Sequence, residues 1–285
     1  MKRIISCIII LLLTQPFADA QNHLFKVFYV TGEVSISQKS QSGNLTKDQL
    51  IYSGDKIKIS EKSTLVLLNT ENKPLVIEKD GSYSTKNISN LYADINNENI
   101  SQKYFNYVVE EFMHHQAEKK YTGAVSRGKG LSMRRPFDSC IIMSNQIIFQ
   151  WNNPEQIDYW FFIYTIDGKR IFESQGKDSE IIIYTDKTEL KKGNAYLWMV
   201  SVNQFPAKDD LLNIFSLASE DQVHLFTNEM NAIKERFISE EYGWDMGTNL
   251  LLLYGFFITN KLYEEAEKTK KIIQDNYPNA HLFND

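Results

Sequence analysis

The stretch that decides most of the fold reads Leu190-Lys191-Lys192-Gly193-Asn194-Ala195-Tyr196-Leu197-Trp198-Met199-Val200. Gly193 and Asn194 mark a turn, and the residues after them are β-favouring and aromatic. Upstream, large apolar residues alternate through 147–151, and Asp167-Gly168 is a hairpin signal. Two facing sheets pack about 10 Å apart, and large inward side chains fill that space. Residues 138–205 are therefore predicted to form a β-sandwich.

The order of residues in this segment has a counterpart in a known family. Leucine, turn glycine, tyrosine, tryptophan and valine follow one another at Leu190, Gly193, Tyr196, Trp198 and Val200. This order resembles the late strands of fibronectin type III-like sandwiches, and the earlier Trp151 fits the same pattern. The resemblance implies an immunoglobulin/fibronectin-like β-sandwich.

Residues 21–83 are predicted to form a second, smaller β-barrel or sandwich, because short β-favouring runs alternate with Gly and Asn turns. The segments that carry a family pattern are Gly32-Glu33-Val34, Leu50, Gly54-Asp55-Lys56-Ile57, Ser63-Thr64-Leu65-Val66-Leu67 and Gly81-Ser82-Tyr83. Together they resemble the FecR-type β-domain of bacterial envelope proteins. The best-known FecR members are transmembrane anti-sigma regulators, but this chain is expected to have neither the cytoplasmic nor the membrane segment of that arrangement after signal cleavage.

Residues 84–137 are expected to form a polar linker with one helix at 104–119, where apolar residues recur at helical spacing. Residues 206–285 are predicted to be helical, with a final pair at 247–259 and 261–276. This pair resembles a single tetratricopeptide repeat through Leu250, Leu253, Phe257, Tyr263, Ala266, Ile273 and Pro278. Tyr254 and Lys270 depart from that repeat's pattern. The fold class is therefore multi-domain and β-rich, with a helical connector and a C-terminal helical hairpin.

The first 20 residues have the layout of a secretory signal peptide. Lys2 and Arg3 precede a short apolar run, and Ala18-Asp19-Ala20 fits the cleavage rule. The apolar run is too short to cross a bilayer as a helix, and no transmembrane segment is expected after cleavage. The chain is therefore expected to be exported, either to the periplasm or to the cell surface.

Composition excludes several classes of protein. The net charge of −5 gives no broad basic surface, so nucleic acid is not an expected partner. Two cysteines cannot supply a disulfide or zinc framework, and Cys140 lies in an isoleucine-rich context that indicates burial. His114 and His115 point about 100° apart on a helix, which suits a solvated face better than one metal ion. No catalytic, cofactor-binding or metal-binding residue is assigned.

Four residues are candidate partner contacts: Trp244, Tyr254, Arg134 and Arg135. Trp244 lies in a hinge before the last helix pair, and the two arginines end the only basic cluster, which begins at Arg127. Exposed aromatic residues would also allow glycan binding, although Trp160 and Trp198 lie in β runs where core filling is commoner.

These features predict a non-enzymatic envelope protein that acts as a protein- or glycan-binding scaffold, with homo-oligomerisation left open. One alternative is an accessory or regulatory subunit of an exported enzyme, such as a caspase-like protease. Another is a hydrolase whose site would join His114, His115 or Arg134 to carboxylates of the sandwich.

Overall fold

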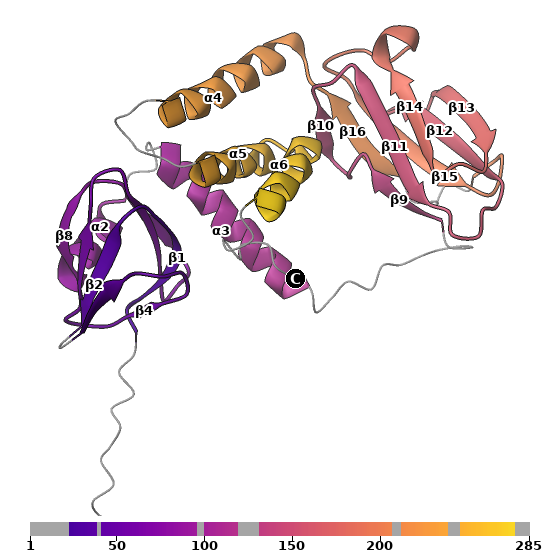
Figure 1. Cartoon of the computed structure of the whole chain (residues 1–285). Helices are drawn as coiled ribbons and strands as arrows, with labels where there is room; N and C mark the ends of the chain where they lie inside the picture. Colours follow the sequence, from indigo (N-terminus) through magenta and orange to yellow (C-terminus); the bar gives the residue numbers. More distant parts are fainter. Residues whose placement is uncertain are drawn as a thin grey trace, which may run out of the picture.

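The computed structural model describes residues 23–38, 41–95, 100–118, 131–206, 212–238 and 246–276. It confirms a mixed architecture of several antiparallel sheets and five α-helices within these residues. An N-terminal β-domain, a group of helices and a larger β-sandwich follow one another across the molecule (Figure 1). None of the described helices has the length and apolarity that crossing a membrane requires.

The N-terminal β-domain consists of two four-stranded sheets, ordered β4-β1-β6-β7 and β3-β2-β5-β8. In strand β5, Lys56 and Lys58 face solvent while Ile57 and Ile59 are buried, which is the alternation that the sequence indicates. The strands are β1 (Phe25–Thr31), β2 (Val34–Gln38), β3 (Gln41–Asn44), β4 (Leu50–Ile51), β5 (Lys56–Ile59), β6 (Thr64–Asn69), β7 (Pro74–Ile77) and β8 (Gly81–Ser84).

Helix α2 (Thr85–Ala93) lies in the stretch that was expected to be a linker. Ser84 and Asn87 form a capping box at its start, so the polar residues that suggest a loop instead begin a helix. Ile88 is buried in the β-domain core, and Tyr92 stacks on Phe25 with ring centroids 5.3 Å apart. The β-domain therefore extends beyond residue 83 and includes α2.

Four helices form the middle of the molecule: α3 (Ile100–Glu118), α4 (Glu220–Ile238), α5 (Met246–Thr259) and α6 (Tyr263–Asn276). Helix α3 begins four residues before the predicted start, and α5 and α6 agree closely with the predicted hairpin. Helix α5 is buried along nearly its whole length, since α3, α4 and α6 all pack against it. The C-terminal hairpin is thus part of a larger helical body that includes the connector helix.

The helical body and the N-terminal β-domain share one hydrophobic core. Phe28, Tyr29 and Val66 of the β4-β1-β6-β7 sheet belong to the same buried cluster as the helices. The Tyr29 hydroxyl lies 3.0 Å from Thr248 Oγ1 of α5. Gln102 of α3 covers the outer edge of β7, because its Oε1 accepts from the Val76 N–H at 2.9 Å. These contacts hold the two parts together as one body.

The second β-unit is a sandwich of a three-stranded sheet, β14-β11-β9, and a five-stranded sheet, β10-β16-β15-β12-β13. Trp198 is fully buried between them and packs edge-on against Phe149 at 5.2 Å. The elements are β9 (Ser132–Arg135), β10 (Cys140–Ile142), β11 (Gln146–Asn152), β12 (Tyr159–Thr165), β13 (Arg170–Gly176), β14 (Glu180–Tyr184), the 3-10 helix η1 (Thr185–Lys187), β15 (Ala195–Ser201) and β16 (Asn213–Leu217).

The sandwich extends beyond the predicted range of 138–205 at both ends. Strand β9 precedes it and pairs with β11, while β16 lies in the segment that was expected to be helical. Strand β16 pairs antiparallel with β15 and parallel with β10. Its partner β10 lies about 70 residues away in sequence, so no local pattern could reveal the pairing between these two strands.

Candidate functional site

One end of the sandwich carries a surface hollow of about 700 Å³, which we call the hairpin hollow. One wall is the turn between β12 and β13, and the other is the loop that leads into β15. Most of its lining side chains are polar or charged. They are Thr165, Ile166, Asp167, Lys169, Ile171, Glu189, Lys191, Gly193, Asn194, Ala195 and Tyr196.

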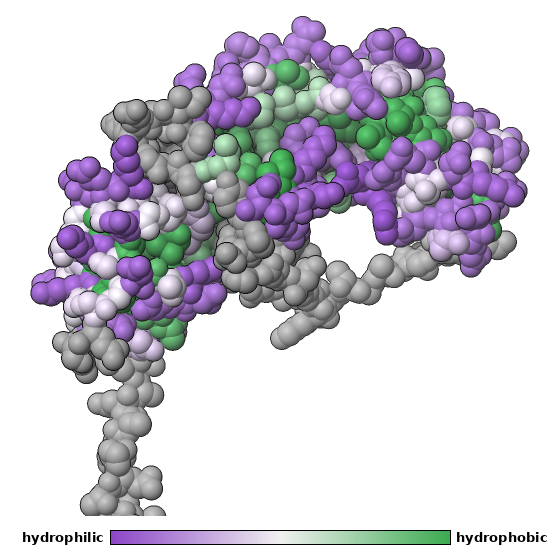
Figure 2. Space-filling view, in the orientation of Figure 1, coloured by the Kyte–Doolittle hydropathy of each residue, from purple (hydrophilic) through white to green (hydrophobic). Residues whose placement is uncertain are grey.

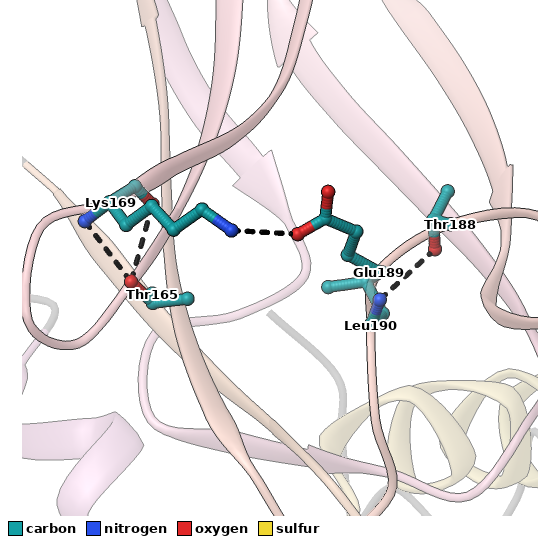
Figure 3. Close-up of polar contacts among 5 residues, drawn as sticks. All are labelled: Thr165, Lys169, Thr188, Glu189 and Leu190. Atoms are coloured by element: carbon teal, nitrogen blue, oxygen red, sulfur yellow. Dashed lines mark hydrogen bonds and ion pairs between the residues drawn. The ribbon is translucent and has the colours of Figure 1, made fainter.

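Hydrogen bonds hold both walls of the hairpin hollow, and Figure 3 shows those between Thr165 and Lys169. The Lys169 N–H donates to Thr165 Oγ1 at 3.1 Å, and the Thr165 hydroxyl in turn donates to the Lys169 carbonyl at 3.2 Å. On the other wall, the Lys191 N–H donates to the Tyr196 hydroxyl at 2.7 Å. Lys169 Nζ spans the gap to Glu189 Oε2 at 3.0 Å. The bonds that hold the walls therefore involve the backbone, and the exposed ion pair between Lys169 and Glu189 crosses the hollow.

The charged and polar groups that line the hairpin hollow are suited to binding a ligand. Hydrogen bonding with the Thr165 side chain lowers the pKa of Asp167, which favours its charged form. Lys169 and Glu189 are both about two-thirds exposed, and a pair in water contributes little to stability. Tyr196 is only 2% exposed, so its ring offers no platform for a sugar. The lining therefore offers polar and charged groups and no exposed aromatic ring.

A second surface lies on the outer face of the three-stranded sheet. Ile148, Ile182 and Tyr184, which we call the outer patch, are each more than 40% exposed. Ile148 and Ile182 face each other across β11 and β14. Figure 2 shows the corresponding hydrophobic surface over these two strands. The sequence signal was the apolar run 147–149, in which both faces of the strand carry large side chains.

The structure describes three of the four predicted partner contacts. Trp244 lies outside the described residues. Tyr254 is only 2% exposed, so the prediction of a surface contact is wrong for this residue, which instead packs inside the helical body. Arg134 is exposed on β9, as a contact residue would need to be. Arg135 binds Glu264 of this chain, with Nη1 and Oε2 3.4 Å apart.

The contact between Arg135 and Glu264 is part of a junction that joins the sandwich to helix α6. The Arg135 guanidinium also lies 5.8 Å from the Phe137 ring centroid, and Phe137 meets Tyr263 edge-on at 6.3 Å. The Ile141 N–H of β10 donates to the Lys261 carbonyl at 2.8 Å. A sequence pattern could not predict this junction, because its partners are more than 100 residues apart.

Two carboxylates at the junction are poorly solvated. Burial raises the pKa of Glu264 above its usual value, although Arg135 acts in the opposite direction. Burial also raises the pKa of Glu265. Glu264 Oε1 and Glu265 Oε2 are buried and find no hydrogen-bond partner among the described groups. The charged forms of both side chains therefore cost stability in the folded state.

We expect Glu265→Gln to raise the melting temperature at pH 7.5 and to have little effect near pH 4. The folded-state pKa lies above the usual value of 4.5, so the charged carboxylate penalises the fold only as pH rises through and beyond that range. At a pH below that usual value, Glu265 is protonated in both the folded and the unfolded state, so the substitution does not change the stability. Thermal melts of both proteins across this pH range test the prediction, and an equal shift at both pH values would contradict it.

Cys140 is fully buried in the sandwich core, as its sequence context indicated. Burial raises the pKa of its thiol to about 12, with Glu264 acting in the same direction. Because the thiolate is the reactive form, this residue is not suited to catalysis.

We expect Cys140 in the native chain to resist a water-soluble thiol reagent and to react once the chain is unfolded in denaturant. Titration of the signal-free chain, in which this is the only cysteine, measures both states. Rapid labelling of the native protein would show that the thiol is accessible, and would contradict the burial.

The described residues provide no cluster of three or more His, Cys, Asp or Glu side chains that could hold a metal ion. His114 and His115 lie on α3, in the part of the helix whose side chains are not described, and Arg127 lies outside the described residues. His224 on α4 lies 3.1 Å from Asn228 Nδ2, four residues along the same exposed helix face.

Comparison with models of known protein families finds no match, and comparison with curated proteins finds no significant relative.

Proposed function

We propose that this chain is a non-enzymatic, exported envelope scaffold that binds a protein partner through the hairpin hollow. The observation that carries the proposal is the shared core and junction, which hold two β-units at fixed positions on one helical body. Export rests on the signal-peptide pattern of residues 1–20, which lie outside the described residues.

The order of strands supports an immunoglobulin/fibronectin-like interpretation of the sandwich. Sandwiches of this kind place the first, second and fifth strands in one sheet and gather their loops at the two ends. Here β9, β11 and β14 form one sheet, and they take the first, second and fifth places once the short extra strand β10, which joins the other sheet, is set aside. The hairpin hollow occupies one loop end of the sandwich, opposite the end that carries the β11–β12 loop.

The polar lining favours a protein ligand. Lys191 and Asn194 are exposed beside the half-exposed Ile166, so charged, amide and apolar groups are presented together. Protein interfaces combine such groups. Resemblance to FecR-type and tetratricopeptide modules, both associated with protein assembly, adds support at the level of analogy only.

Site-specific photocrosslinking tests the proposal. A photoreactive phenylalanine analogue replaces Ile166 in the hairpin turn, and the signal-free chain is irradiated in envelope extract. The control carries the analogue at the exposed Glu155, before β12 and thus at the opposite end of that strand. We expect one envelope protein to crosslink at position 166 and not at position 155, and Lys191→Glu to weaken this crosslink.

Equal crosslinking at both positions, or none, would contradict binding at the hairpin hollow. Crosslinking to a glycan fraction alone would replace the protein ligand with a sugar. An exported protease as the crosslinked partner would favour the role of accessory subunit.

A further inference from the structure

The edge strands of the sandwich differ in how well they are protected. Each sheet ends in strands whose outer N–H and C=O groups lack a neighbour, and such edges pair readily with other chains. The four edges are β9 and β14 in one sheet, and β10 and β13 in the other. Natural sheets cover these edges or place charges on them.

Three of the four edges carry such protection. Strand β10 is covered by the helical body, where the Ile141 N–H donates to the Lys261 carbonyl. Strand β13 carries an ion pair between Arg170 and Glu173, whose charged atoms are 2.8 Å apart. Strand β9 ends in Arg134 and Arg135.

Strand β14 is apolar after Glu180 and, among the described residues, pairs only with β11. The Trp151 N–H donates to the Ser179 carbonyl, and the Thr185 N–H donates to the Asn145 carbonyl. Hydrogen bonding alternates along an antiparallel pair, so odd-numbered residues of β14 bond to β11. Glu180 and Ile182 therefore direct their N–H and C=O groups to the open edge, and Tyr184 directs its N–H there, while its carbonyl accepts from the Thr188 hydroxyl at 3.4 Å.

The side chains of these three residues also lie on the exposed face of the sheet. Ile182 and Tyr184 are 44% and 43% exposed, and Ile148, directly opposite Ile182, is 41% exposed. An open edge and an apolar face therefore coincide at the outer patch. A strand added at this edge would satisfy the backbone groups and cover the isoleucines.

We propose that the occupant of this edge is a second copy of the chain, whose own β14 pairs antiparallel with Ile182 opposite Ile182. The two three-stranded sheets then become one sheet of six strands. Because the same patch is used on both copies, the contact is isologous and closes at a dimer.

The sequence of β14 is complementary to itself in this register. Ile148, Ile182 and the same two residues of the second copy form a continuous row across the joined sheet. Glu180 falls opposite Tyr184 of the second copy. Within one chain, Lys187 Nζ lies 5.0 Å from the centre of the Tyr184 ring. Glu180 of one copy therefore comes near Lys187 of the other copy, so a carboxylate meets a cation at each end of the contact. The proposal does not depend on the hairpin hollow.

Sedimentation velocity over a micromolar concentration series measures the association. A contact between two short strands is small, so we expect a weak, reversible monomer–dimer equilibrium. Ile182→Lys should weaken dimerisation more than about tenfold, because it places two like charges beside each other on the two-fold axis. Ile214→Lys is the matched control, since Ile214 is 39% exposed on β16, inside a sheet. Circular dichroism confirms that both variants fold.

Disulfide crosslinking tests the register. Ile182→Cys should form a covalent dimer under mild oxidation, and Ile214→Cys should not. Mixed Glu180→Cys and Tyr184→Cys chains should crosslink with each other more than either does alone. A chain that stays monomeric throughout, or a dimer that Ile182→Lys leaves intact, would overturn the proposal.

Discussion

Phe256→Ala is expected to lower the free energy of unfolding by about 3–5 kcal/mol. Phe256 is fully buried in α5 and meets Tyr104 of α3 and Phe226 of α4, each edge-on at about 6 Å. Removing the ring leaves a cavity at the centre of the core that the helices share with the N-terminal β-domain. The surrounding helices cannot close over it without losing their other contacts.

Chemical denaturation followed by circular dichroism measures this loss. Phe205→Ala is the matched control, because Phe205 is 79% exposed and its removal should change the stability by less than about 0.5 kcal/mol. Since the core is shared, the variant should also weaken the N-terminal β-domain, and both parts should unfold together. Similar stabilities for the two variants would contradict the packing described.

Gly255→Val is expected to cost about 1–3 kcal/mol, although glycine is a poor helix former. A Cβ at position 255 would lie 2.6 Å from the Tyr104 carbonyl oxygen and 3.0 Å from the Val108 side chain. Helices α3 and α5 approach so closely here that any side chain must force them apart. The steric clash between α3 and α5 therefore costs more stability than the higher helix propensity of valine restores.

Gly43→Val provides the control, because a Cβ at that position in β3 meets no other atom within 4 Å. Thermal melts of the two variants should differ clearly, with only Gly255→Val lowering the melting temperature. A stabilising effect of Gly255→Val would show that α3 and α5 do not contact each other as described.

The sequence predicted the elements whose signals are local. The alternation in β5, the turn at Gly193 and the apolar spacing in α5 and α6 each report on a few neighbouring residues. Helix α2 was missed because its start is made of Ser84 and Asn87, residue types that are equally typical of loops.

The contacts that join the parts could not be predicted, because they link distant residues. Tyr29 meets Thr248, and Arg135 meets Glu264, although no local pattern marks either pair. Tyr254 illustrates the same difficulty. It departs from the repeat pattern and was taken as a surface residue, but its ring fills space that only the packed helices create.

The functional surfaces were partly visible in the sequence. Asp167-Gly168 and Gly193-Asn194 were recognised as turns, but only the fold brings them together around the hairpin hollow. The outer patch depends on the pairing of β11 with β14, which sets Ile148 opposite Ile182.

Pulsed electron paramagnetic resonance tests most directly whether the helices hold the two β-units in one fixed arrangement. Spin labels are placed at the exposed Lys86 of α2 and Lys177 between β13 and β14, each replaced by cysteine, while the buried Cys140 stays unlabelled. A fixed scaffold predicts a single narrow distribution of distances between the labels. A broad distribution, like that of two domains on a flexible linker, would contradict it.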